Sequence, residues 1–179
     1  MASYPTEEIY EVYWEGPFTL EELKKHAKKE PDLAKNWTLY TKYENHPLYG
    51  RDVLTYIGMA SAQDVVTRLG QHDLDREKVF VGIIFKFESW EDSKRKWEED
   101  WDDLLDYIVK DKPTILAIES LLIFALWPAG NLKNRKSAKD SWRYRIFNTG
   151  YLGSLPHEVS GHYTFEKLPQ TLKQAEEDE

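Results

Sequence analysis

The feature that most constrains the fold is an apolar run at residues 115–127, thirteen positions interrupted only by Glu119 and Ser120. Such a run supports about three and a half helical turns. Pro113 suits the first turn of a helix, and Pro128 with Gly130 favours its end. A helix that is apolar on every side is normally buried on every side. We therefore expect a central helix here, with Glu119 either inside the protein or opening into a cleft.

Glu119 lacks a charge partner on its own helix. The positions three and four residues away are Ile115, Leu116, Leu122 and Ile123, and these are the positions that share a helix face with it. A buried carboxylate is costly unless a cation meets it or it stays protonated. The helix alone favours an ion pair with an arginine from elsewhere in the fold, and a metal ligand is the alternative.

Composition narrows the class of protein. The chain of 179 residues has seven Trp, eleven Tyr and seven Phe, enough aromatic side chains for a folded core. It contains no Cys, so disulfides and thiolate zinc sites are excluded. No signal-like segment is present, and no apolar run reaches the ~18 residues of a membrane span. We expect a cytoplasmic protein with no membrane partner.

The net charge of −8 is unevenly distributed. Eight acids face three basic residues at 91–106, and the last six residues carry four acids. Residues 132–147 instead hold six basic residues against one acid, with Trp142, Tyr144 and Phe147 interleaved. That pattern suits a phosphate backbone, although a solvated surface strand explains it about equally well. The predicted nucleic-acid-binding residues are Lys133, Arg135, Lys136, Arg143 and Arg145.

Local patterns predict alternating strands and helices. Strands are expected at residues 9–15, 37–43, 53–57, 78–88 and 142–148, with Gly16 and Pro17 ending the first. The strand at 78–88 is apolar almost throughout, which predicts a central position. The second and third strands suggest an antiparallel hairpin with a long loop at 44–51. Capping-box signals open helices at 19–29 and 62–72, and an acidic helix is expected at 90–109.

Several residues within 37–131 together resemble the GIY-YIG nuclease superfamily. Tyr40 ends a Thr-Leu-Tyr tripeptide where that family's first tripeptide ends in Tyr, and Tyr56, Ile57 and Gly58 reproduce its second. Further along, an Arg and a His lie four apart on a predicted helix, and a Glu precedes a Pro and an Asn: Arg68, His72, Glu119, Pro128 and Asn131. The first tripeptide lacks the family's Gly and Ile, and Arg68 follows Gly58 by ten residues, about two more than expected.

The resemblance implies an α/β (α+β) fold, with a small three-stranded antiparallel sheet flanked by helices. Residues 37–132 would form the catalytic core, with an acidic helical insertion at 90–109. Residues 1–36 would be an N-terminal strand–helix extension, and residues 133–179 a basic and aromatic C-terminal extension ending in an acidic tail. Such extensions supply substrate specificity or the contacts of a possible homodimer.

The resemblance also implies a metal-dependent endonuclease acting on phosphodiester bonds in nucleic acid, with double-stranded DNA as the expected substrate. Glu119 would hold Mg²⁺ or Mn²⁺, and Arg68 would bind the phosphate. Tyr40 and Tyr56 would position the water, with His72 assisting proton transfer. Gly58 and Asn131 would have structural roles. The alternative is a catalytically degenerate member that binds nucleic acid or protein, favoured by the acidic balance and the altered first tripeptide.

Overall fold

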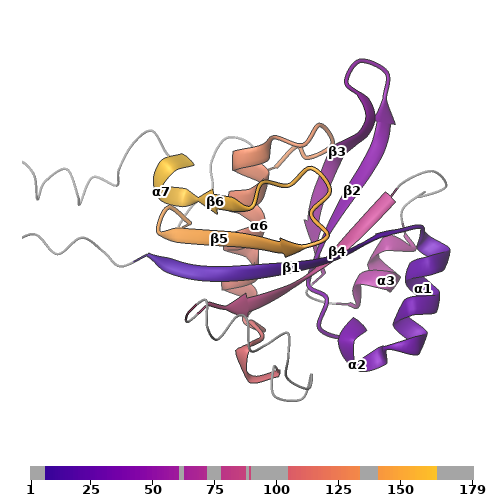
Figure 1. The fold of residues 1–179 in the computed structure, drawn as a ribbon, viewed down its shortest axis with the longest axis horizontal. Helices are drawn as coiled ribbons and strands as arrows, with labels where there is room; N and C mark the ends of the chain where they lie inside the picture. Colours follow the sequence, from indigo (N-terminus) through magenta and orange to yellow (C-terminus); the bar gives the residue numbers. More distant parts are fainter. Residues whose placement is uncertain are drawn as a thin grey trace, which may run out of the picture.

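A computed structural model describes residues 7–60, 63–71, 78–87, 89, 105–133 and 141–164. These residues form a mixed α/β structure around one curled, six-stranded sheet (Figure 1). The strands are β1 (Glu8–Phe18), β2 (Leu39–His46), β3 (Gly50–Met59), β4 (Lys78–Lys86), β5 (Tyr144–Gly150) and β6 (Glu158–Ser160). Their order across the sheet is β3-β2-β4-β1-β5-β6.

The six strands correct the prediction of a small three-stranded sheet. Strands β3, β2 and β4 do lie side by side and antiparallel, as expected for residues 37–88. However, β1 pairs antiparallel with β4 on one side and parallel with β5 on the other. The segments predicted to be N- and C-terminal extensions therefore supply interior strands of the same sheet. A parallel partner far along the chain leaves no local sequence signal, which explains the error.

The helices are α1 (Leu20–Lys29), α2 (Pro31–Ala34), α3 (Val65–Leu69), α6 (Lys112–Leu126) and α7 (Gly161–Thr164), with a 3₁₀ turn at Leu105–Tyr107. The capping box of α1 is present: Thr19 caps the helix and the Glu22 carboxylate accepts from the Thr19 backbone N–H at 2.8 Å. Helix α3 is capped by Asp64, which accepts from the Thr67 N–H at 2.8 Å. This start lies later than the predicted one, whose cap Ser61 falls outside the described residues.

Strand β4 is central, as its apolar sequence predicted, because both of its faces are buried. Val79, Val81, Ile83 and Phe85 face one core cluster, which also holds Leu23 of α1 and residues of α3. Phe80 and Ile84 face the other cluster, which holds the buried face of α6. Helix α6 thus covers one face of the sheet, while α1 and α3 cover the other.

Helix α6 forms where the apolar run predicted it. Asp111 caps its start by accepting from the Thr114 N–H at 3.0 Å, and Trp127 ends it in a left-handed conformation with φ of 51°. Burial on all sides is not observed, since Leu116 is 45% exposed. Within the described residues no helix has both the length and the apolar character needed to cross a bilayer.

Three other local predictions need correction. Strand β1 continues through Gly16 and Pro17 to Phe18, which pairs again with Val79 after a register irregularity. The β2–β3 loop is shorter than 44–51, because both strands extend into it. Most of the acidic helix predicted at 90–109 lies outside the described residues; at its end, a 3₁₀ turn is followed by Ile108, which bridges to Phe85 of β4.

Candidate active site

Tyr40 and Tyr56 lie on neighbouring strands and on the same face of the sheet. Their rings stack with centroids 6.0 Å apart and planes at 20°. Gly58, which pairs with Tyr40 across the strands, is what leaves room for this arrangement. A Cβ atom at position 58 would lie 2.5 Å from Tyr40 Cζ and 2.7 Å from Tyr56 Cε1. The glycine of the Tyr-Ile-Gly tripeptide is thus required by the two tyrosine rings themselves.

Arg68 and Glu119 converge on this tyrosine pair from helices on opposite faces of the sheet. Arg68 on α3 lowers the pKa of Tyr40 through hydrogen bonding and charge, and its positive charge also lowers the pKa of Glu119. The backbone N–H of Met59, the last residue of β3, also lowers the pKa of Glu119 on α6. Four predicted site residues, from four elements, therefore lie in one place.

The electrostatics of the site are set mainly by burial. Burial raises the pKa of the Glu119 carboxyl from 4.5 to about 7, although the Met59 N–H and Arg68 oppose the shift. Burial likewise raises the pKa of Tyr40 to about 12, with the neighbouring Tyr56 adding to the shift and Arg68 opposing it. Both groups are thus held toward their neutral forms, and additional positive charge nearby would favour their ionised forms.

Asn131 fixes the segment after α6 against the strand that carries Tyr56. Its Oδ1 accepts from the Ile57 N–H at 2.9 Å, and its Nδ2 donates to the Ile57 carbonyl at 2.8 Å. The adjacent Gly130 N–H donates to the Thr55 carbonyl at 2.7 Å. The amide side chain therefore replaces a strand partner at the outer edge of β3, which is a structural role.

Lys42 is a site neighbour that the sequence analysis did not single out. It lies on β2 two residues after Tyr40, opposite Tyr56, and its Nζ lies 5.8 Å from the centre of the Tyr56 ring. The period of two along a strand places residues 40 and 42 on one face. That periodicity was the signal available for finding it.

Two of the predicted nucleic-acid-binding residues, Arg143 and Arg145, are separated from this cluster. Arg143 pairs with Glu8 at 2.9 Å, and Arg145 pairs with Glu7 at 2.8 Å and with Glu158 at 3.1 Å. These arginines lie at or near β5, three strands away from β2. Lys133 is exposed. The other predicted members, Arg135 and Lys136, and the predicted proton shuttle His72 lie outside the described residues.

The Glu119 carboxylate is the side chain of this cluster that could hold a hard divalent cation such as Mg²⁺. Among the described residues no group of three or more His, Cys, Asp or Glu side chains comes together. Mg²⁺ commonly keeps several waters and binds proteins through only one or two carboxylates. Glu119 is a partly buried carboxylate whose pKa burial raises to about 7, and a bound cation would favour its ionised form. The chemistry of this single donor fits Mg²⁺ or Mn²⁺.

Comparisons with known proteins give no independent assignment of this cluster. Searches with the whole chain against protein-family models, curated proteins and solved structures found no match in any of the three.

Proposed function

We propose that the chain is a metal-dependent endonuclease of the GIY-YIG type, which hydrolyses phosphodiester bonds in DNA. The observation that carries the proposal is the convergence of Tyr40, Tyr56, Arg68 and Glu119 from β2, β3, α3 and α6. These residues are spread over eighty positions of the sequence, yet Tyr40 stacks on Tyr56, and the charges of Arg68 and Glu119 both act on Tyr40. Their chemistry also matches the needs of phosphodiester hydrolysis.

Each side chain has a distinct role in this proposal. Arg68 offers a planar set of donors to the non-bridging oxygens of the phosphate, where negative charge grows in the transition state. The Tyr40 side chain, on whose pKa Arg68 acts, orients the attacking water and, in its deprotonated form, accepts the water's proton to become the neutral phenol. Tyr56 packs against the Tyr40 ring and restricts its position.

Glu119 would hold the divalent cation. Such an ion, when bound, supplies Lewis acidity and charge that offsets the negative charge on the phosphate. The chain itself keeps the carboxylate in place through the Met59 N–H and shields it from solvent by burial. The pKa of Tyr40 is about 12, so at neutral pH its hydroxyl is protonated without further positive charge. Arg68 and a cation on Glu119 are the charges available to lower it.

The proposal is tested by cleavage of long, mixed-sequence DNA in Mg²⁺, in Mn²⁺ and in EDTA. Glu119→Gln, Arg68→Ala and Tyr40→Phe should each lose activity by about a hundredfold or more, because they remove the metal ligand, the phosphate-binding cation and the base that the proposed hydrolysis requires. The matched control is Tyr43→Phe, on the same strand but facing the other core cluster. It should cleave like the wild type. Equal cleavage by all four variants would indicate a contaminating nuclease and refute the assignment.

A second candidate is a catalytically degenerate binding module. The raised pKa of Tyr40 favours it, since an unassisted tyrosine of pKa about 12 is a poor source of base at neutral pH. A binding module would retain duplex in a gel-shift assay and leave it intact with either metal. The nuclease would give nicked or cut products that depend on the metal.

A further inference from the structure

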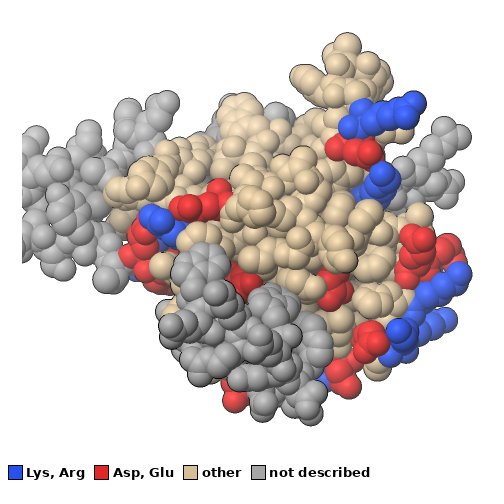
Figure 2. All heavy atoms as spheres, in the orientation of Figure 1, with Lys and Arg blue, Asp and Glu red and all other residues tan. Residues whose placement is uncertain are grey.

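The β2–β3 hairpin projects from the body of the molecule as an arm (Figure 1). Its tip, residues 46–50, presents Leu48 and Tyr49 to solvent, with exposures of 84% and 71%. In the space-filling view this tip carries neither acidic nor basic atoms, and charged atoms appear below it (Figure 2). Two large apolar side chains together at the end of a projecting arm are a mark of a contact surface.

The tip is held in one conformation. His46 Nδ1 accepts from the N–H groups of both Leu48 and Tyr49, at 3.2 and 3.3 Å. The His46 ring also packs on the Tyr49 ring, with centroids 4.7 Å apart. Gly50 closes the turn with φ of +95°, a conformation that favours glycine. The backbone that carries Leu48 and Tyr49 is therefore held by His46, and the Tyr49 ring packs on the His46 ring, which lowers the entropic cost of binding there.

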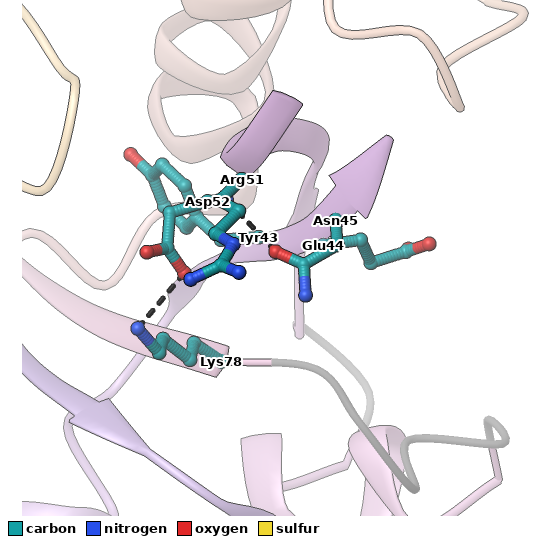
Figure 3. A pocket seen from close by; sticks show the side chains of 6 residues that line it. All are labelled: Tyr43, Glu44, Asn45, Arg51, Asp52 and Lys78. Carbon is teal, nitrogen blue, oxygen red and sulfur yellow. Dashed lines mark hydrogen bonds and ion pairs between the residues drawn. The ribbon is translucent and has the colours of Figure 1, made fainter. Parts of the chain in front are cut away.

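A polar pocket of about 310 Å³ lies at the base of the tip (Figure 3). Lys78 pairs with Asp52 at 2.8 Å, and the Asp52 N–H donates to Asn45 Oδ1 at 3.3 Å. Glu44 accepts a hydrogen bond from Thr55 at 3.0 Å. Arg51 also lines the pocket, is exposed, and makes no ion pair with any described residue. Arg51 is thus the cation available to a ligand beside the apolar tip.

The arm is continuous with the candidate active site. Strands β2 and β3 carry Tyr40 and Tyr56 at one end and the tip at the other, with Lys42 against Tyr56 between them. Strand β2 extends six residues beyond Tyr40, to His46 at the start of the tip, which is about 20 Å of extended chain. A two-stranded ribbon is one of the elements that the major groove of B-DNA, about 12 Å wide, can admit. The arm has the shape and reach to enter that groove while the active site is at the backbone.

We propose that the β2–β3 arm is the duplex-reading element of the protein. It enters the major groove of DNA, where Leu48 and Tyr49 contact base edges and Arg51 contacts a backbone phosphate. The proposal rests on the proposed function for its choice of nucleic acid as ligand. Apolar contacts with thymine methyl groups are part of major-groove readout, which gives Leu48 and Tyr49 a defined target. Arg51 adds a contact that does not depend on sequence.

Binding is measured by fluorescence anisotropy with an end-labelled, mixed-sequence DNA duplex over a series of salt concentrations. All proteins carry Glu119→Gln, so that the probe stays intact. Leu48→Ser with Tyr49→Ser should weaken binding about fivefold or more at every salt concentration, with the salt slope unchanged. Arg51→Ala should instead reduce the slope of log affinity against log salt by about 1. The controls Tyr151→Ser and Lys35→Ala remove an exposed aromatic and an exposed cation elsewhere, and should change neither quantity.

The same variants are then tested on a duplex RNA of equal length. The major groove of A-form RNA is too deep and narrow for side chains to read, so the tip variant should bind RNA as its parent does. Equal losses on RNA and DNA, or no loss on DNA, would overturn the proposal. Sedimentation shows whether the tip instead joins two copies of the chain: a dimer that becomes monomeric in the tip variant, with DNA affinity unchanged, also overturns it.

Failure of this proposal and failure of the nuclease assignment give different results. If the wild type binds duplex DNA through the tip but does not cleave it, the nuclease assignment is wrong and the proposal for the arm stands. If the tip variant cleaves DNA in a metal-dependent manner with the same KM as the wild type, the nuclease assignment stands and the proposal for the arm is wrong. No binding of any duplex by the wild type refutes both.

Discussion

For Glu119, the sequence and the structure together predict how the free energy of unfolding depends on pH. Its helix provides no cation, as the sequence indicated, and Arg68 on α3 only partly offsets its burial. The folded chain therefore binds the Glu119 proton more tightly than the unfolded chain does. Between about pH 4.5 and about pH 7, this single group makes the fold less stable as the pH rises.

Glu119→Gln should remove this dependence, because the amide cannot ionise. In EDTA at pH 8 the variant should be more stable than the wild type by up to about 3 kcal/mol, and the two should converge below about pH 4.5. Denaturant unfolding over a pH series measures the difference. Added Mg²⁺ should stabilise the wild type at pH 8 and leave the variant unmoved. A constant difference across the series would mean that the carboxyl titrates normally.

Part of the candidate site could be predicted from residue types alone. Tyr40, Tyr56, Arg68 and Glu119 were selected by spacing and resemblance, and the structure brings all four together. The Met59 N–H that meets Glu119 could not be predicted, because every residue except proline carries such a donor. Lys42 could not be selected by residue type, because only the strand register places it opposite Tyr56.

Local sequence patterns predicted most of the strands and helices, but they predicted the first and last residues of each element less accurately. Helix α1 begins where its capping box predicted, because Thr19 and Glu22 satisfy each other's backbone groups locally. The strand β6 and helix α7 had no periodic signal and were missed, since three or four residues cannot display a period. The β2–β3 loop was overestimated because residues such as Asn45 and Gly50 favour turns yet here lie within strands.

The contact between the segment after α6 and strand β3 depends on one side chain. Asn131→Ala would leave the N–H and carbonyl of Ile57 buried without partners, since Ile57 is 0% exposed. We expect a loss of about 2 kcal/mol or more in the free energy of unfolding, read from the denaturation midpoint at unchanged slope. Asn45→Ala, which removes an exposed amide, should stay within about 0.5 kcal/mol of the wild type. An Asn131→Ala loss this small would show that the interaction is replaceable.

For the whole molecule, the strand partners could not be read from the sequence. Residues 9–15 and 142–148 were each predicted to be strands, but nothing in either pattern indicates that they pair in parallel across most of the chain. Long-range pairing depends on the complementary burial of many side chains at once, and single-sequence periodicity reports only one strand at a time. The family resemblance covers 37–131 and therefore includes neither of these two strands.

The six-stranded sheet leads to a test of the predicted 37–132 core. Among the described residues, one core cluster contains eighteen buried side chains, and seven of them lie outside that segment: Tyr10, Val12, Trp14, Tyr144, Ile146, Leu155 and Val159. At about 1.5–3 kcal/mol for each buried side chain, their loss removes about 10–20 kcal/mol of apolar burial. That exceeds the net stability of about 5–15 kcal/mol typical of a domain. The isolated 37–132 segment should therefore show no cooperative thermal transition by circular dichroism and no dispersed amide spectrum by NMR.

A 7–164 chain retains every described element, so it should unfold cooperatively near the temperature of the full chain. If 37–132 also unfolded cooperatively, β1 and β5 would be additions to a self-sufficient core, and the domain boundaries predicted from the sequence would stand.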